Sequence, residues 1–141
     1  MIELSIPGRA VAKARPRVTK RGTFTPKKTR DYEKHVANLI SEYMKQRNLA
    51  RLEGALRLNM LIYRPIPASW PKEKQTAARG DIIRPTSKPD IDNEIKAIMD
   101  AMNGVCLKDD AQIVELLIKR HYTEAVPFVF VQLYRIGEGS N

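Results

Sequence analysis

Residues 127–135, PFVFVQLYR, constrain the fold most because apolar side chains occupy successive positions there. Side chains of a β-strand point alternately to its two faces. Phe128 and Phe130 would therefore lie on one face, and Val129 and Val131 on the other. A strand that is apolar on both faces is typical of the centre of a sheet, so this segment predicts a central strand with neighbours on both sides.

Three further segments predict strands of the same sheet. Residues 2–6 alternate apolar and polar side chains before Pro7-Gly8, and residues 55–64 alternate in the same way. The alternation predicts strands that each bury one face. Residues 112–122 form the third segment, and a turn around 124–127 joins it to the central strand.

The chain between the first two strands predicts a helix that ends near Asn48, because apolar side chains recur there at helical spacing. Thr29 is expected to cap its N-terminus. Asp31 and Glu33 would then fall in the first turn, where the helix dipole favours acidic side chains.

Residues 64–89 hold five prolines, which break any long element. Ser69, ahead of Trp70-Pro71, is expected to cap a short helix that runs to about Ala78. A connection this long in a compact domain is usually functional or partly disordered.

A second main helix is predicted at 90–103. On a helical wheel the apolar positions fall within about 100° of arc. Asp92, Lys96 and Asn103 lie beside this stripe, and Asp100 follows further round. The predicted buried stripe consists of Ile91, Ile95, Ile98, Met99 and Met102.

The order of these elements predicts one domain that spans residues 1–141. Its length suffices for a single core. The class is α/β of the α+β type: a mixed β-sheet with two main helices packed on it. Residues 15–25 add a basic N-terminal arm or hairpin that turns near Arg21-Gly22.

Positive charge is concentrated in this arm. Residues 1–30 hold nine basic side chains against one acidic one, whereas the whole chain has a net charge of +9. Such an arm indicates a polyanionic partner, most commonly nucleic acid, although a solvated tail has the same composition. The side chains expected to contact DNA phosphates here are Lys13, Arg15, Arg17, Lys20, Arg21, Lys27 and Lys28.

Several classes of protein are disfavoured. A single cysteine, Cys106, permits neither an internal disulfide nor a cysteine zinc site, and fits a reducing cytosol. No apolar run approaches the roughly 20 residues needed to span a bilayer, and the N-terminus lacks a signal-peptide stretch. We therefore expect a soluble cytoplasmic protein with no membrane partner. His35 and His121 belong to no metal motif, and scattered glycines predict no nucleotide cofactor.

Five aspartates fall within residues 88–114 of this basic chain. Taken singly, Asp90 could be an N-cap, Asp92 could pair with Lys96, and Asp109-Asp110 could form a polar turn. Taken together, they indicate a divalent cation, because hard cations such as Mg²⁺ take oxygen ligands and keep waters that can act as nucleophiles. An EF-hand is excluded because its required glycine and glutamate are absent from the corresponding positions.

The segments KPDIDNEIKAIMDAMNGV and KDDAQIV closely resemble the signature of the RusA-type Holliday junction resolvases, including their phage-encoded members. IPGRAVAKARPRVTKRGTFTPKKTRDYE and PASWPKEK are similar to further segments of that family, so the likeness covers most of residues 2–135. The resemblance implies a small homodimeric, Mg²⁺-dependent endonuclease that binds four-way DNA junctions and nicks opposing strands.

Carried over by position, the family's essential acidic residues correspond to Asp90, Asp92 and Asp110, which would be catalytic and hold Mg²⁺, with Mn²⁺ as a substitute. Lys96 would be the catalytic lysine that holds the phosphate or the water, and Asp109 an auxiliary acid. Some relatives carry a run of arginines before the first aspartate. Here Arg84 and Lys88 occupy that stretch and are the expected DNA contacts at this edge.

The leading hypothesis is a metal-dependent, structure-specific endodeoxyribonuclease that resolves Holliday junctions by paired nicks in DNA recombination and repair. One alternative is a branched-DNA-binding protein without catalysis. The carboxylates argue against it, because a pure binder gains nothing from negative charge beside phosphate. A flap or fork nuclease of the same fold is the other alternative, and the sequence does not separate it from a resolvase.

Overall fold

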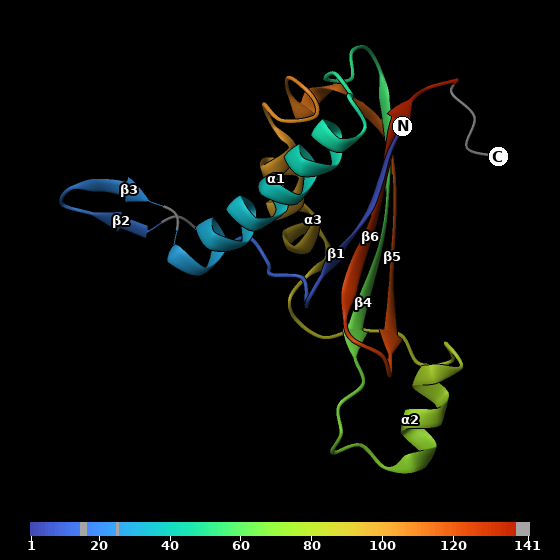
Figure 1. The fold of residues 1–141 in the computed structure, drawn as a ribbon. Coiled ribbons are helices and arrows are strands. Elements are labelled where there is room, and N and C mark those ends of the chain that lie inside the picture. Colours follow the sequence, from blue (N-terminus) through green and yellow to red (C-terminus); the bar gives the residue numbers. More distant parts are fainter. Residues whose placement is uncertain (15–16, 25, 138–141) are drawn as a thin grey trace.

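The computed structural model describes residues 1–14, 17–24 and 26–137. It forms an α+β domain around one four-stranded mixed sheet with the strand order β1-β6-β4-β5 (Figure 1). The strand β4 pairs parallel with β5, and the other pairs are antiparallel. The elements in chain order are β1 (Ile2–Pro7), β2 (Arg17–Thr19), β3 (Gly22–Phe24), α1 (Lys27–Gln46), β4 (Leu56–Pro65), α2 (Lys72–Arg79), α3 (Ile91–Met102), the 3₁₀ turn η1 (Asp110–Gln112), β5 (Ile113–Thr123) and β6 (Phe128–Arg135).

The predicted mixed sheet with two main helices is confirmed. The strand β6 lies between β1 and β4, as its two apolar faces predict. Because β4 and β5 are parallel, the chain must cross over between them, and α2 and α3 lie in this crossover. The helices α1 and α3 pack against each other on one face of the sheet (Figure 1).

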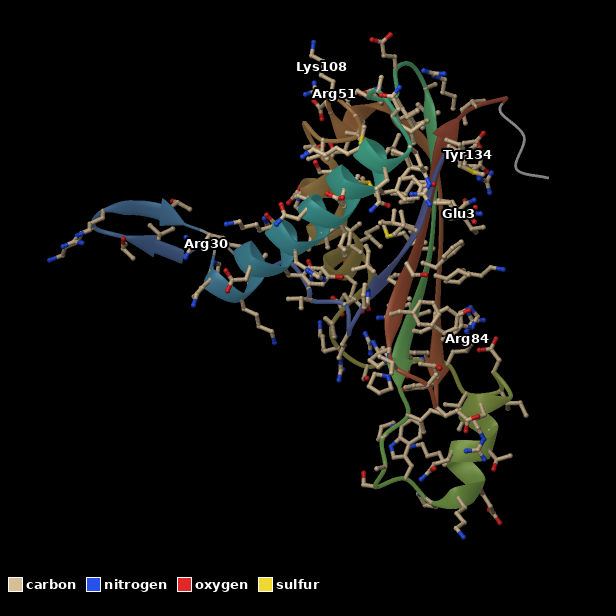
Figure 2. The ribbon with its side chains drawn as sticks, in the orientation of Figure 1. Glu3, Arg30, Arg51, Arg84, Lys108 and Tyr134 are labelled. Carbon is tan, nitrogen blue, oxygen red and sulfur yellow. The ribbon has the colours of Figure 1, made fainter. Side chains whose placement is uncertain are left out.

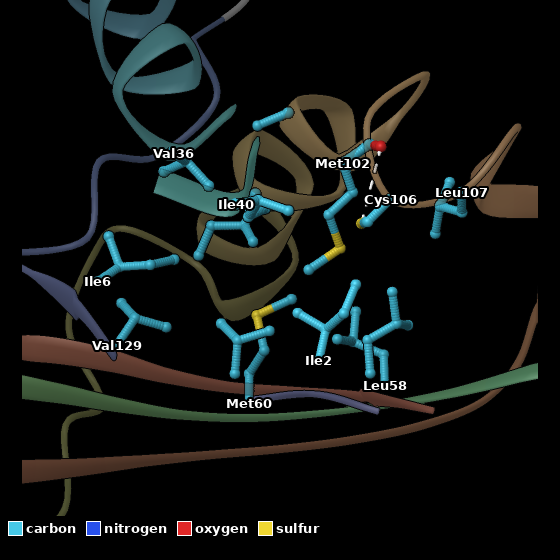
Figure 3. Packing of buried hydrophobic residues seen from close by; sticks show 14 of the residues in the cluster. Ile2, Ile6, Val36, Ile40, Leu58, Met60, Met102, Cys106, Leu107 and Val129 are labelled. Carbon is cyan, nitrogen blue, oxygen red and sulfur yellow. Dashed lines mark hydrogen bonds between the residues drawn. The ribbon is translucent and has the colours of Figure 1, made fainter. Parts of the chain in front are cut away.

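The core fills the space between these two helices and the sheet. Figure 3 shows Ile40 of α1 and Met102 of α3 above Met60 of β4 and Ile2 of β1. All four are fully buried. Cys106 lies in the same cluster, and burial raises the pKa of its thiol to about 12. The thiol is therefore a packed group with little thiolate at neutral pH.

The opposite face of the sheet is covered by neither α1 nor α3, and α2 contacts only the end of β5 there (Figure 1). Leu61 and Tyr63 of β4 lie on it beside their β6 partners Phe130 and Phe128. These side chains are half-buried, and Leu117 of β5 is 41% exposed. We call this surface the open face of the sheet.

The predicted basic hairpin is confirmed for the described residues. The strands β2 and β3 pair antiparallel and project away from the body of the domain (Figure 1). Lys20 and Arg21 form the tip between them. Gly22 follows with φ +119°, a conformation that glycine adopts readily and other residues rarely do.

Two predicted helix starts are wrong. The helix α1 begins after Pro26, so Asp31 and Glu33 lie beyond its first turn. Thr29 is buried inside the helix, and its hydroxyl accepts a hydrogen bond from Ala14 N–H at 3.3 Å, so it ties down the preceding arm and does not cap the helix.

The short helix α2 similarly follows Pro71, not Ser69, although its existence is confirmed. In both helices a proline directly precedes the first helical residue. Proline is tolerated there because its missing N–H would have no hydrogen-bond acceptor within the helix. Within the described residues, no helix is both long and apolar enough to cross a membrane.

The buried face of α3 is rotated from the predicted stripe. Ile91 is 38% exposed, whereas Glu94, Ala97 and Ala101 are buried. Ala97 and Ala101 are small residues of the core cluster. The helical wheel did not predict that Glu94 is buried, because a glutamate is buried only when cationic side chains pair with it. Its cationic partners come from strands that are distant in the sequence.

Candidate active site and nucleic-acid interface

Asp90 and Asp92 lie at the start of α3. Asp90 occupies the N-cap position, but its side chain accepts no capping hydrogen bond. Its carboxylate instead pairs with Lys88, with Nζ 3.0 Å from Oδ1, and it stays 54% exposed. Asp92 is exposed in the first helical turn, where the helix dipole favours negative charge. Both carboxylates are thus exposed to solvent at the start of α3.

Asp109 and Asp110 lie near the opposite end of α3. The Asp109 carboxylate accepts a hydrogen bond from Ala111 N–H and forms a capping box with Gln112 around η1. The Asp110 N–H donates to Asn103 Oδ1 at 2.9 Å, which attaches this turn to the residue after α3. Asp109 is therefore partly structural, because it caps the turn that carries Asp110.

The pKa of Asp110 is raised above its ordinary value. Burial is the first cause, because it disfavours the charged form, and the second is a hydrogen bond and negative charge from Asp109. The charge of Asp100 adds to the effect. Asp100, Asp109 and Asp110 therefore form an acidic group near the C-terminal end of α3.

Lys96 pairs with Asp100 at 3.7 Å, and not with Asp92. Lys13 also reaches Asp100, with Nζ 3.2 Å from Oδ2. Asp100 is thus a candidate site residue to which the sequence analysis gave no role. Its spacing of four residues from Lys96 was the signal that could have identified it.

The two acidic groups are separated by the helix itself. Asp90 and Asp92 begin α3, while Asn103, which binds Asp110, follows its end. A helix of 12 residues is about 18 Å long at 1.5 Å per residue. Among the described residues, no group of three or more histidine, cysteine, aspartate or glutamate side chains is arranged to hold a metal ion. Asp90 and Asp92 therefore share the start of α3, and Asp110 does not lie beside them.

The basic residues predicted to contact DNA differ in how free they are. Lys13 is largely buried, pairs with Glu33 as well as Asp100, and donates its backbone N–H to Asn93 O at 2.8 Å. Its charge is thus used to join the arm to α1 and α3. The Arg84 guanidinium donates from Nε to Arg120 O at 2.7 Å, although its side chain is 42% exposed.

Four of the predicted basic residues are exposed and form no ion pair within the described chain: Lys20, Arg21, Lys27 and Lys28. Two of them lie at the tip of the hairpin and two in the first turn of α1. Arg30 extends this surface and lies at the junction of hairpin and helix, whereas Arg84 lies near the α2 end of the sheet (Figure 2). Arg15 falls outside the described residues, and Arg17 is placed only by its backbone in β2.

Comparison with known proteins identifies the family of the chain. The family model described as endodeoxyribonuclease RusA matches residues 7–134. The chain belongs to the RusA endodeoxyribonuclease family. It is also 33% identical over 129 residues to the uncharacterized protein YqaN of Bacillus subtilis (strain 168), a match that covers 87% of this chain and 89% of that protein. The resemblance carried by residues 88–114 is thereby confirmed.

Membership of the RusA family makes this chain a nuclease that hydrolyses phosphodiester bonds of DNA. The family is one of Holliday junction resolving endonucleases that act in DNA recombination, and such nucleases generally use a divalent metal ion. The exposed Asp90-Asp92 pair fits a site of this kind, because Mg²⁺ is often bound by one or two carboxylates together with substrate phosphate.

Proposed function

We propose that this protein is a cytoplasmic, Mg²⁺-dependent homodimeric enzyme that resolves four-way DNA junctions by paired symmetric nicks. The observation that carries this proposal is the exposed Asp90-Asp92 pair at the start of α3, within the residues that match the RusA family. The exposed basic surface from the hairpin to α1 supports a DNA substrate.

Asp90 and Asp92 would hold the metal ion, whereas Asp110, the third predicted ligand, lies near the other end of α3 and is too far away to bind the same ion within one chain. Mn²⁺ would substitute for Mg²⁺. The bound ion would acidify a water and neutralise charge on the phosphate. Because Asp110 lies near the far end of α3 within one chain, variants must test its contribution separately from that of the pair.

Lys96 and Asp109 would assist this site in different ways. Lys96 is 60% exposed, so its ammonium group can leave Asp100 to hold a DNA phosphate or the attacking water. Asp109 would act indirectly, because it caps η1 and raises the pKa of its neighbour Asp110.

The second copy of the chain is proposed to bind the open face of the sheet. Leu61 and Phe130 are half-buried there and Leu117 is 41% exposed, so the face presents apolar area that a monomer leaves in water. A two-fold dimer would supply two equivalent sites for two cuts. Light scattering should give a particle of twice the 16.1 kDa chain mass. Leu117→Lys should yield monomers, whereas Val126→Lys, which changes an exposed turn, should not.

The deciding experiment is a cleavage assay with a synthetic four-way junction, a flap and a linear duplex, each with Mg²⁺ or with EDTA. We expect symmetric paired nicks in the junction that require the metal and disappear in Asp92→Asn. Preference for the flap would identify a flap or fork nuclease. Binding of the junction without any cut would identify a non-catalytic branched-DNA-binding protein, and cleavage in EDTA would refute the metal mechanism.

A further inference from the structure

A buried cluster of three charged side chains joins the first turns of α3 to the strands β4 and β5. Glu94, one turn after Asp90, is only 1% exposed. Arg64 of β4 and Arg120 of β5 each place a guanidinium nitrogen 2.8 Å from the same oxygen, Oε1 of Glu94. Their side chains are 3% and 15% exposed. Two strands and one helix therefore meet at a single carboxylate.

Such a cluster is a poor way to gain stability. Removing charged groups from water costs several kcal/mol per ion, and their mutual attraction often does no more than offset it. Arg64 Nε is in addition buried without a hydrogen-bond partner among the described residues. A buried ion cluster with an unsatisfied donor needs an explanation other than stability.

The same two arginines hold the backbone that leads into Asp90. Both donate to the carbonyl oxygen of Pro89 at 2.8 Å. Arg64 also donates to Ser87 O at 3.0 Å, and Arg120 to Pro85 O at 3.2 Å. The segment 85–89 is thus attached to β4 and β5 at three carbonyl groups, all within five residues of Asp90.

Glu94 completes the connection to the helix. Its N–H donates to Asp90 O at 3.2 Å, so the first turn of α3 is closed between Asp90, which directly follows the Pro89 carbonyl that the arginines hold, and Glu94, with which they pair. The segment before Asp90 and the turn after it are consequently fixed to the sheet by the same two side chains. Asp90 and Asp92 lie between these two points of attachment.

We propose that Arg64, Glu94 and Arg120 are positioning residues that set the geometry of the Asp90-Asp92 pair for phosphodiester cleavage. This inference rests on the proposed function. None of the three contacts DNA in it, because Arg64 and Glu94 are almost fully buried. Their effect is to keep the two carboxylates where a reacting phosphate requires them, since small misplacements of catalytic groups slow chemistry strongly.

Arg120→Lys is the most informative variant, because Arg120 is the most exposed of the three and its replacement keeps the charge. One ammonium group lacks the planar fork that reaches Glu94, Pro89 and Pro85 together. Arg57→Lys is the matched control. It changes an arginine on the same sheet that pairs with Glu115 across the same two strands at 3.0 Å and does not touch residues 85–89.

We expect Arg120→Lys to lower the single-turnover cleavage rate at saturating junction DNA by at least about tenfold, while the Kd for the junction changes less than about twofold. Arg57→Lys should change neither. Ile2→Val, which removes one methyl group from the buried core at β1, separates positioning from stability because it lowers the Tm at a strand that pairs with neither β4 nor β5. If Arg120→Lys slows cleavage no more than Ile2→Val at a comparable loss of Tm, the cluster is merely structural and the proposal fails.

Hydrogen exchange of the DNA-free protein provides the second measurement. The Glu94 amide, which donates to Asp90 O, should exchange faster in Arg120→Lys than in wild type, and at the wild-type rate in Arg57→Lys. Unchanged exchange would refute the attachment of this segment whatever the substrate. If the wild-type protein cuts no DNA, the proposed function fails and the catalytic role of the cluster fails with it, whereas faster exchange would still establish the attachment.

Discussion

Replacing Lys20 and Arg21 with alanine should weaken DNA binding and reduce its dependence on salt. Both residues lie at the tip of the projecting β2–β3 hairpin, are exposed, and form no ion pair within the described chain. Each phosphate contact contributes about −0.9 to the slope of log affinity against log salt. Loss of two contacts should therefore reduce the slope by about 1.8, and wild type should lose about 12-fold more affinity than the variant between about 50 and 200 mM salt.

The assay is fluorescence anisotropy of a labelled four-way junction in a series of salt concentrations. Lys45→Ala/Arg47→Ala is the control, because it removes the same charge from exposed positions at the far end of α1. Its slope should stay near that of wild type. An unchanged slope in Lys20→Ala/Arg21→Ala would show that the hairpin is a solvated arm. Equal reductions in both double variants would show that only the total charge matters.

Three further predictions follow from the site and the core. Asp90→Asn should abolish cleavage while junction affinity is kept or raised, because negative charge beside phosphate is removed; Asp31→Asn on the exposed side of α1 should cut like wild type. Cys106 should react with a thiol reagent at pH 8 only after urea unfolds the protein, since burial raises its pKa to about 12; rapid reaction of the folded protein would contradict this packing. Asp81→Asn should destabilise the protein at neutral pH and match wild type in strong acid. The hydrogen bond from His121 lowers the pKa of Asp81, so its stabilisation is present above the ordinary carboxyl value and is lost as pH falls through the lower folded value. Urea unfolding at several pH values measures the difference.

Local patterns were sufficient for the strands and for the hairpin. The period of two in residues 2–6 and 55–64 follows from which face of a strand is buried, and the structure keeps those faces. The two apolar faces of β6 placed it correctly in the interior of the sheet. The position of Asp90 and Asp92 at the start of a helix was also predictable, because it depends only on residues 88–103.

Contacts between distant segments were not predictable in this way. Glu94 reads as an ordinary surface glutamate until Arg64 and Arg120, 30 and 26 residues away, are brought to it by the parallel pairing of β4 and β5. Lys13 likewise reads as a free cation, and only the packing of the arm against α1 and α3 pairs it with Glu33 and Asp100. The helical wheel mispredicted the buried face of α3 for the same reason, because pairing of Glu94 with the two arginines turns a different side of the helix toward the core.

The distribution of charge along the chain follows from these contacts. A nuclease must place carboxylates beside a polyanion, and the carboxylates must not repel it before a cation binds. In this chain the buried cluster of Arg64, Arg120 and Glu94 has one positive charge in excess and holds the Pro89 carbonyl next to Asp90. Lys88 lies at the surface: its Nζ is 3.0 Å from Asp90 Oδ1, and its side chain is 86% exposed. Because an exposed ion pair contributes little stability, Lys88 can exchange Asp90 for a phosphate at small cost. Lys88→Ala should therefore weaken junction binding more than it changes the cleavage rate at saturating DNA, whereas Arg120→Lys should do the reverse. If both variants change the same quantity, binding or cleavage rate, Lys88 and the buried cluster do not have these separate roles.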